Sequence, residues 1–427
     1  MTSRRAGLVI GTAVFAATTL AWLLLQNLTL GDKQIDSIVE TDYAVADPQF
    51  QRVMGTLLGP PLLAGNDVRA LANGDEIFPA MLEAIRSARH SITFETYIYW
   101  SGAIGKEFAL AFAERARAGV RVHVMLDWWG SEDIEELHLQ ALRDAGVEVQ
   151  RYNPPRLATL GRVNNRTHRK LLVVDGRIGF TGGVGIADPW RGHAQDAAHW
   201  RDMHYRVSGP VVAQLQTAFL DNWTIATGRV LHGDAYLPPL PATGTHAAQV
   251  FTSAPGGGAE SAQFMYLLSI AAARRTVRLS MAYFVPDDVA VRTLVAARRR
   301  GVRVQMVVPG AHTDRAILRR ASRFEWGPLL EAGVEIYEYR PTMYHCKVMI
   351  VDEVWVSVGS TNFDSRSFSV NDEANLNIHD AGFAREQVAR FDADLRDSHP
   401  VTLAQWAGRR WQDKLLDALA GTLSSQL

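Results

Sequence analysis

A histidine and a lysine two residues apart, followed five residues later by an aspartate, occur twice in this chain. The two copies are His168, Lys170 and Asp175, then His345, Lys347 and Asp352. On a β-strand, residues two apart point to the same face, so each copy directs an imidazole and an ammonium group into one space. Two such pairs that converge would form a site for phosphate chemistry.

One copy of this pattern carries little weight on its own. A chain with 13 histidines among 427 residues matches it by chance on the order of once in a hundred chains. The ordinary interpretation of a single copy is a buried strand end with a hydrogen-bonded histidine and a surface lysine. Two copies with identical internal spacing are far rarer, so the pair favours a catalytic site.

Each lysine is followed by a short apolar segment and a turn, which together predict a β-hairpin. The first hairpin turns at Asp175-Gly176 and the second at Asp352-Glu353, and Asp-Gly is typical of two-residue hairpin turns. We count both aspartates with the catalytic motif. Because they stand at the turns, we interpret them as turn formers or internal ion-pair partners that need not touch the substrate.

The composition is that of a folded protein, with 47% hydrophobic and 21% charged residues. A formal net charge of −1 supplies no general attraction to nucleic acid, so no nucleic-acid partner is expected. Cys346 is the only cysteine, which excludes an intrachain disulfide, and strand alternation makes it a small core residue. The sequence has no evident cluster of metal ligands, and we expect neither a metal nor a cofactor.

The N-terminal segment predicts a membrane anchor. The run Gly7–Leu25 is nearly all apolar and follows Arg4 and Arg5, and it has about the length that a helix needs to cross a bilayer. A cleaved signal peptide would have a shorter apolar core and a small-residue cleavage site. We therefore expect residues 1–31 to be an uncleaved anchor, with the N-terminus in the cytoplasm and the catalytic body on the outer face.

The rest of the chain repeats one α/β unit. A helix-period stretch at 77–88 leads into a strand-like segment at 91–99, and the same order returns at 262–273 and 277–285. The offset between the copies drifts by a few residues along the chain. This drift indicates loop insertions and deletions around one fold rather than a short repeat period.

Alternating strands and helices favour largely parallel sheets covered by helices, to which the hairpins add antiparallel strands. The expected fold is two similar α/β domains, with mixed sheets flanked by helices, which close face to face around one shared active site. The expected boundaries are a connecting segment at 32–61, a first domain at 62–231, a Pro- and Gly-containing linker at 232–246, a second domain at 247–400 and a C-terminal amphipathic helix at 401–427.

The segments 167–183 and 344–366 resemble the paired motif of the phospholipase D superfamily and, within it, the bacterial cardiolipin synthases of the two-copy type. Supporting similarity lies at 95–99 and 200–202, and the resemblance spans nearly everything from about 62 to 399. It implies that one histidine attacks the phosphorus of a phosphodiester to give a phosphohistidine, while the other protonates the leaving alcohol. The second histidine then deprotonates the incoming alcohol or water.

Carried onto this chain, the resemblance makes His168 the nucleophile and His345 the acid and base, with the reverse assignment as the alternative. Neutral imidazole is a competent nucleophile near pH 7, and its pKa suits proton transfer. Lys170 and Lys347 would neutralise the non-bridging phosphate oxygens as point charges.

The resemblance also implies residues that support the histidines. Two acids that open downstream strands, Asp202 and Glu373, match the family's orienting acceptors, and surface ion pairing is their ordinary alternative. In the first copy Gly185 stands where an asparagine is usual, which leaves that role to the second copy alone. The residues that resemble the family's phosphate-side loop are Gly182, Gly183, Ser360 and Asn362.

Aromatic residues stand at several strand ends and in the C-terminal segment. Five of them could line an acyl or glycerol path, namely Tyr97, Tyr99, Trp100, Trp128 and Trp129, although most aromatics so placed belong to a core or rim. Trp406 and Trp411 lie among basic residues on the C-terminal helix. Such a helix suits a membrane surface, and docking on the protein body is the alternative.

The leading functional hypothesis is phosphatidyl transfer, as in the condensation of two phosphatidylglycerols to cardiolipin and glycerol at a bacterial inner membrane. Its expected partners are phospholipid substrates, phosphatidylglycerol in particular, and the membrane. The alternatives are phospholipase D hydrolysis to phosphatidic acid, a phosphodiester nuclease and a non-enzymatic membrane organiser. The paired motif does not choose between alcohol and water as acceptor, because pocket shape and water exclusion decide that.

Overall fold

The computed structural model describes residues 11–22, 35, 37–155, 164–254 and 259–423. Much of the expected anchor, residues 1–10 and 23–31, lies outside the described residues, while residues 11–22 are helical and exposed. Among the helices that the structure describes, none combines the length and apolar character needed to cross a membrane. The anchor stays a prediction.

The two halves of the chain contribute similar sets of strands. Those of the first half are β1 (Leu63–Ala72), β2 (Ser91–Thr96), β3 (Arg121–Asp127), β4 (Glu148–Tyr152), β5 (Arg166–Thr167), β6 (Leu171–Val174), β7 (Ile178–Gly182) and β8 (Met203–Ser208). Those of the second half are β9 (His246–Ser253), β10 (Thr276–Met281), β11 (Phe284–Val285), β12 (Arg303–Pro309), β13 (Glu335–Tyr339), β14 (Lys347–Val351), β15 (Trp355–Gly359), β16 (Phe363–Asp364), β17 (Asn371–His379) and β18 (Ser398–Val401).

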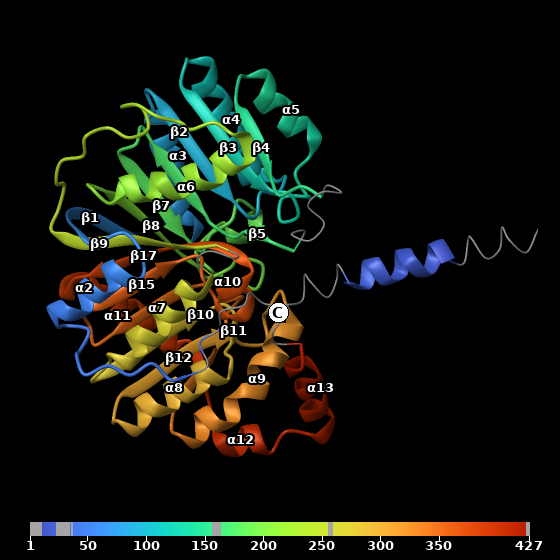
Figure 1. The fold of residues 1–427 in the computed structure, drawn as a ribbon, viewed down its shortest axis with the longest axis vertical. Helices are drawn as coiled ribbons and strands as arrows, with labels where there is room; N and C mark the ends of the chain where they lie inside the picture. The colour runs from blue at the N-terminus through green and yellow to red at the C-terminus, as the bar shows by residue number, and fades with distance from the viewer. Residues whose placement is uncertain (1–10, 23–34, 36, 156–163, 255–258, 424–427) are drawn as a thin grey trace, which may run out of the picture.

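Over the described residues these strands form one mixed, 16-stranded sheet that runs through both halves (Figure 1). Its order is β18-β13-β12-β10-β14-β15-β17-β9-β1-β8-β7-β6-β2-β3-β4, with β5 paired to β17, while β11 and β16 form a separate pair. Within the large sheet, only β2-β3-β4, β10-β12-β13 and the β5–β17 pair run parallel. The expectation of largely parallel sheets was therefore wrong, because each motif hairpin adds antiparallel neighbours.

The halves meet edge to edge rather than face to face. Strands β1 and β9 pair antiparallel, with Leu63 opposite Ala248 and Asn66 opposite His246. Strand β5, just before the first histidine, pairs with β17 of the second half, with Asn371 opposite Arg166. The expected face-to-face closure is thus corrected: backbone hydrogen bonds between edge strands join the halves, and they bring the two motifs to the same seam.

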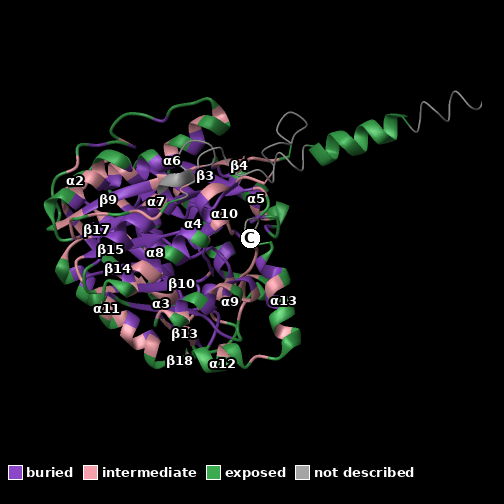
Figure 2. Ribbon diagram, turned by 60° about the horizontal axis from the view of Figure 1, so that its bottom comes forward, coloured by how far each residue is buried: buried purple, intermediate pink, exposed green. Residues whose placement is uncertain are grey.

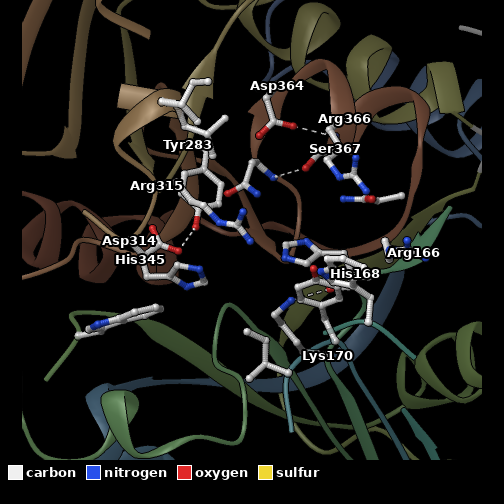
Figure 3. Close-up of a pocket in the computed structure, with 18 of the residues that line it drawn as sticks. Arg166, His168, Lys170, Tyr283, Asp314, Arg315, His345, Asp364, Arg366 and Ser367 are labelled. Atoms are coloured by element: carbon white, nitrogen blue, oxygen red, sulfur yellow. Dashed lines mark hydrogen bonds between the residues drawn. The ribbon is translucent and has the colours of Figure 1, made fainter. Parts of the chain in front are cut away.

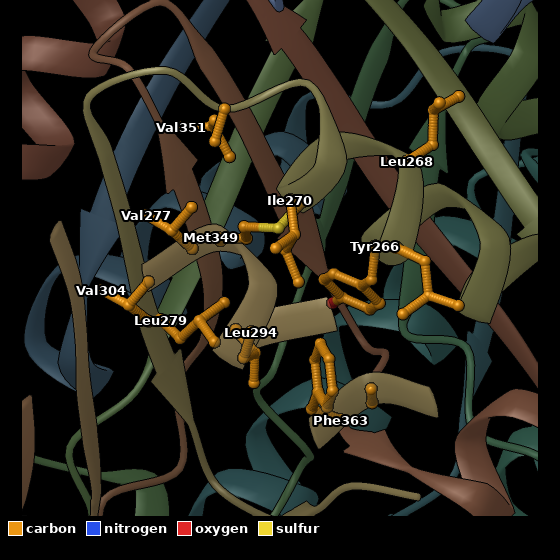
Figure 4. Close-up of a cluster of buried hydrophobic side chains, with 14 of the residues drawn as sticks. Tyr266, Leu268, Ile270, Val277, Leu279, Leu294, Val304, Met349, Val351 and Phe363 are labelled. Carbon is orange, nitrogen blue, oxygen red and sulfur yellow. The ribbon is translucent and has the colours of Figure 1, made fainter. Parts of the chain in front are cut away.

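Helices cover both faces of the sheet, and buried residues lie on its strands beneath them (Figure 2). One face carries α3 (Asn73–Ser87), α4 (Ala103–Arg117) and α5 (Glu136–Asp144) over the first half, with α7 (Ala259–Ala271), α8 (Asp288–Arg299) and α9 (Ala316–Glu331) over the second. The other face carries α6 (Val212–Thr227) and α11 (Ala381–Arg396), whose side chains share one core across both halves. Figure 4 shows the core beneath α7 and α8, where Tyr266, Leu279 and Met349 pack together.

The expected connecting segment belongs partly to the core of the second half. Its helix α2 (Pro48–Leu57) buries Phe50 and Met54, and the ring of Phe50 meets Trp355 edge to face at 5.0 Å. The sequence did not predict this packing, because the apolar face of α2 is short.

The C-terminal segment forms two helices instead of the single one expected. These are α12 (Leu403–Ala407) and α13 (Trp411–Gly421), and both pack against α9. The buried carboxylate of Asp417 accepts from Arg409 at 2.5 Å and from Arg320 at 3.2 Å. These ion pairs fasten α13 to the protein body.

Candidate active site

Both motifs open into one cavity of about 620 Å³ at the seam between the halves (Figure 3). His168 and Lys170 line it from the first half, and His345 lines it from the second. Neither histidine lies within a strand, contrary to the expected strand alternation. Residues 168–170 lie between β5 and β6, and His345 lies two residues before Lys347, the first residue of β14. Two imidazoles nevertheless face a common space.

His168 is held by the second half of the chain. Its Nδ1 lies 2.9 Å from Oε1 and 3.0 Å from Oε2 of Glu373, and its backbone N–H donates to the carbonyl of Asp372 at 2.8 Å. Ser360 Oγ donates to the same Glu373 carboxylate at 2.5 Å. An Nδ1–H that donates to Glu373 leaves the Nε2 lone pair of His168 free for attack.

His345 is held by the first half of the chain. Its Nδ1 lies 2.7 Å from Oδ2 of Asp202, and its backbone N–H donates to the carbonyl of Arg201 at 2.7 Å. The indole N–H of Trp190 donates to the same Asp202 oxygen at 2.9 Å. Each acid therefore orients the histidine of the opposite half, so neither half alone contains a complete histidine–acid pair.

The two lysines occupy matching places. The Nζ of Lys170 donates to the carbonyl of His168 at 2.7 Å, and the Nζ of Lys347 donates to that of His345 at 2.7 Å. Lys347 also lies 3.2 Å from Nε2 of its histidine. Both ammonium groups are buried, so a bound phosphate would meet them in a poorly solvated space where charge attraction is strong.

Burial governs the protonation of the two histidines. Burial lowers the pKa of His168 to about 4, although the carboxylate of Glu373 opposes the shift. Burial and the charge of Lys347 lower the pKa of His345. In the free protein near pH 7 His168 is therefore neutral, which is the form that a nucleophile requires.

The pKa values of the lysines and of the acids also fall, but for different reasons. Burial lowers the pKa of Lys170 to about 7, against the raising effect of Glu373, and it lowers the pKa of Lys347 as well. Burial acts to raise the pKa values of Asp202 and Glu373, but the histidine and lysine beside each acid outweigh it, and both pKa values fall. Both acids are thus anionic acceptors.

Asp175 and Asp352, which we counted with the catalytic motif, do not lie at the catalytic site. Four strand residues separate Lys170 from Asp175, so the aspartate lies roughly 16 Å from it, at the far end of β6. Its carboxylate accepts from the backbone N–H groups of residues 89–91. Asp352 accepts in the same way from residues 274–276. Both aspartates fasten the loop before the neighbouring strand, as their interpretation as turn formers predicted.

The expected phosphate-side loop has a different role at three of its four positions. The N–H of Gly183 donates to the carbonyl of Met203 at 3.0 Å, and a Cβ atom there would meet Oδ1 of Asp202 at 2.2 Å. A Cβ atom at Gly182 would meet His204 at 2.6 Å, and Ser360 donates to Glu373. Gly183 and Ser360 therefore position the acids and Gly182 packs beside His204, while Asn362 lines the cavity.

Several cavity residues were not found from the sequence. The indole rings of Trp190 and Trp200 lie 5.3 and 5.4 Å from the ring of His345. Arg166, Arg315 and Arg366 also line the cavity, and no regular spacing relates them to the motifs. Position 166, two residues before His168, was the one place where the expected strand alternation could have indicated a cavity residue.

The remaining sequence interpretations can be compared with the structure directly. Of the five strand-end aromatic residues, Tyr97, Trp100 and Trp129 line the cavity. Tyr99 is instead buried in the core of the first half, and Trp128 lies under the guanidinium of Arg166. Glu95 is a buried structural carboxylate that accepts from Asn222 at 2.7 Å, and burial raises its pKa to about 7. Cys346 is buried in the core, as expected.

Comparison with known proteins bears on this geometry. A family model described as "Cardiolipin synthase, PLD-like domain" matches residues 81–218 and 266–395, one match in each half. The chain belongs to this family. It is 34% identical over 370 residues to the cardiolipin synthase of Geobacillus sp. (strain WCH70), covering 86% of this chain and 74% of that protein. It is also 34% identical over 364 residues to cardiolipin synthase 2 of Bacillus anthracis, covering 84% and 71%.

Among solved structures, the fold is similar to that of phosphatidylserine synthase from Haemophilus influenzae Rd KW20. The TM-score is 0.67 at 14% identity, covering 88% of this chain and 97% of that one. At this identity the likeness establishes a shared fold, which is the phospholipase D-type mixed α/β architecture.

Proposed function

We propose that this protein is a phosphatidyltransferase of the cardiolipin synthase type, which condenses two phosphatidylglycerols to cardiolipin and glycerol through a phosphohistidine. The observation that carries the proposal is the crossed pair of histidine–acid contacts at one cavity, in a chain of the cardiolipin synthase family. The hypothesis of a non-enzymatic membrane organiser does not account for these two complete pairs.

In the first step, Nε2 of His168 attacks the phosphorus of the first phosphatidylglycerol. The bond between phosphorus and the head-group glycerol oxygen breaks, and that oxygen takes a proton from His345. The phosphodiester anion beside His345 favours its protonated form, and Asp202 stabilises the imidazolium. Lys170 and Lys347 neutralise the non-bridging oxygens.

In the second step, a hydroxyl of the second phosphatidylglycerol replaces the departed glycerol. His345 takes the proton of this hydroxyl, and its oxygen attacks the phosphorus and displaces His168. The products are cardiolipin and free glycerol, and both histidines return to their starting protonation states. With water in place of the hydroxyl, the same step would yield phosphatidic acid, which is the phospholipase D alternative.

The cavity wall favours a lipid acceptor over water. The aromatic and apolar side chains of Tyr97, Trp129 and Ile317 line it, and Trp129 and Ile317 are partly exposed there. Apolar side chains at the cavity wall accommodate the glycerol backbone and first acyl carbons of a phospholipid. This supports transfer as the main reaction and hydrolysis as the minor one.

We also propose that the protein works at a bacterial cell membrane, anchored by residues 1–31 with its catalytic body on the outer face. Helix α13 supports a second contact with lipid. One face docks on the protein body through Asp417, while Trp411, Leu415 and Leu419 are 71%, 51% and 55% exposed on the other. An exposed aromatic and aliphatic face of this kind inserts into the bilayer interface.

Expression in a bacterial host that lacks its own cardiolipin synthases tests the proposed activity. Lipids separated by thin-layer chromatography should contain cardiolipin when the full chain is expressed and none when His168→Ala is expressed. Cardiolipin that forms equally with both chains, or a wild-type lipid profile with phosphatidic acid alone, would contradict transferase function. Protease treatment of intact spheroplasts tests the outer-face location separately.

Co-sedimentation with vesicles tests the contact through α13. In the full chain, the double variant Leu415→Ser, Leu419→Ser should bind vesicles more weakly than the wild type. It should need a higher concentration of anionic lipid for half of the protein to sediment with the vesicles. Leu110→Ser is a matched control, because Leu110 is 59% exposed on α4, away from α13. Equal binding by all three proteins would remove α13 from the membrane contact.

A further inference from the structure

The cavity holds more positive charge than one phosphodiester needs. Besides the motif lysines, its wall contains Arg166, Arg315 and Arg366. Within the described residues none of the three arginines has an ion-pair partner. Guanidinium groups left without carboxylates in a concave site are typical of phosphate recognition.

Two of these arginines are held in place by their surroundings. The guanidinium of Arg366 donates to the side-chain and backbone oxygens of Asn164 at 3.0 and 3.1 Å. The guanidinium of Arg166 stacks over the ring of Trp128, 4.9 Å from its centroid. Arg315 is exposed at the start of α9. Two arginines are therefore pre-positioned, and the third is free to close on a ligand.

The three arginines line the same cavity as Tyr97 and all act on its hydroxyl. Burial raises the pKa of the Tyr97 hydroxyl, and the charges of Arg366, Arg315 and Arg166 all oppose that shift, so all three act on the same place. Tyr97 in turn lies edge-on to His168, with ring centroids 5.3 Å apart. In the view of Figure 3, Lys170 lies below the histidines, while Arg315 and Arg366 lie above them.

The acids near the cavity offset the charge of the arginines only in part, and Asp127 is the acid that attracts Arg166. Asp314 accepts from the hydroxyl of Tyr283 at 2.6 Å, and Asp364 caps α10 (Ser365–Ser369) by accepting from Ser367 N–H at 2.7 Å. Burial raises the pKa of Asp364 to about 7, which reduces its negative charge near neutral pH. The arginines thus leave a net positive region opposite the lysines.

We propose that Arg166, Arg315 and Arg366 form a second phosphate site, which binds the phosphodiester of the acceptor phospholipid while the lysines bind the phosphodiester that reacts. This inference rests on the proposed transferase function and names the feature that selects an anionic lipid as acceptor. In cardiolipin, six single bonds separate the two phosphorus atoms. Six bonds of a fully extended polypeptide backbone span about 7 Å, so the two phosphorus atoms lie at most about 7 Å apart. The second phosphate therefore has to lie in the same cavity.

A competition between two acceptors tests the second site. The full-length protein receives phosphatidylglycerol as donor in mixed micelles that also contain ethanol, and cardiolipin and phosphatidylethanol are quantified together. Ethanol carries no phosphate, so its transfer depends on the donor site alone. Arg315→Gln and Arg366→Gln should each lower the ratio of cardiolipin to phosphatidylethanol about tenfold or more, the scale of one charge-assisted hydrogen bond.

The controls separate this site from general effects. Arg385→Gln removes the same charge from the exposed surface of α11 and should keep the wild-type ratio. Arg366→Lys keeps the charge but loses the two-pronged geometry, and should give an intermediate ratio. Phosphatidylethanol formed by each variant reports that the protein is folded and that the histidines work.

The outcomes distinguish the inference from the function on which it rests. If the wild type makes phosphatidylethanol but no cardiolipin, the proposed function fails, and the second site fails with it. If the wild type makes cardiolipin and both glutamine variants keep the ratio of Arg385→Gln, the transferase function stands and the second site alone is refuted.

Discussion

Nδ1 of His168 and Oε1 of Glu373 lie 2.9 Å apart although 205 residues separate them in the chain. The contact crosses the seam between the halves, and the contact between His345 and Asp202 crosses it in the other direction. Because each catalytic ring takes its orientation from the opposite half, the site exists only when both halves are docked. This relationship leads to the first prediction.

Replacing either acid by its amide should abolish most of the activity without unfolding the protein. Glu373→Gln and Asp202→Asn keep the size of each side chain but remove the anion that fixes the histidine tautomer. We expect kcat to fall about a hundredfold or more, as it does when the acid of a comparable histidine–acid pair becomes an amide. Steady-state kinetics with circular dichroism as the folding control measures this, and a loss under threefold would contradict the orienting role.

The plot of kcat/KM against pH should fall on the acidic side only near pH 4 and should fall on the basic side near neutral pH. His168 has a pKa of about 4, so its nucleophilic nitrogen is protonated, and activity lost, only as the pH falls toward 4. Two groups set the basic limb. Lys170 has a pKa of about 7, so its charge, and with it phosphate binding, is lost as the pH rises above 7. Burial also lowers the pKa of His345, so the proton that this general acid gives to the leaving oxygen is lost on the basic side as well.

The variant Lys170→Arg separates the two limbs. Arginine stays charged throughout this range, so the loss of phosphate binding above pH 7 should disappear, while the basic limb due to His345 and the acidic limb stay in place. An acidic limb at about 6.5 in both proteins would mean that the buried environment does not govern His168.

Asp175 and Asp352 should matter for stability and not for chemistry. Each carboxylate accepts from three consecutive backbone N–H groups, and each residue has a positive φ, 52° and 51°. Asparagine tolerates that conformation but is neutral, so Asp175→Asn should cost about 1–3 kcal/mol of unfolding free energy. Chemical denaturation measures this cost, and kcat of the folded variant should stay near wild type. A large fall in kcat at unchanged stability would return Asp175 to the catalytic group.

The variant Gly183→Ala should lose activity in the same way as a variant that lacks the carboxylate of Asp202. The added methyl group would overlap Oδ1 of Asp202 at 2.2 Å, so the carboxylate has to move away from His345. We expect a fall in kcat comparable to that of Asp202→Asn. Gly382→Ala is the control, because its methyl group meets only an Asp380 oxygen at 3.1 Å near the start of α11. Equal activity of both alanine variants would show that Asp202 tolerates displacement.

The motif pairs could be predicted from the sequence because their geometry is local. Strand alternation predicted that His168 and Lys170 share a space. Both do line the cavity, although residues 168–170 lie between β5 and β6 and not on a strand. The turn positions of Asp175 and Asp352 followed from the same local pattern. The mixed α/β class likewise followed from the alternation of helix-like and strand-like segments.

The crossing of the acids and the positions of the arginines could not be predicted, because both depend on pairing between distant strands. Glu373 reaches His168 through the register of β17 against β5, and no composition or spacing within either segment determines that register. Arg166, Arg315 and Arg366 come from three separate segments that meet only at the cavity. The edge-to-edge joining of the halves, in place of face-to-face closure, was missed for the same reason.

Trapping the covalent intermediate tests the central claim that both imidazoles serve one phosphorus atom, with His168 as nucleophile. A labelled phosphatidyl ester of p-nitrophenol is suitable, because this leaving group departs without a general acid. The His345→Ala protein should release about one equivalent of p-nitrophenol and retain the label on His168, as mass spectrometry of its peptides would detect. The His168→Ala protein should stay unlabelled. Label on His345 in the His168→Ala protein, or sustained p-nitrophenol release by either variant without any label, would contradict the account.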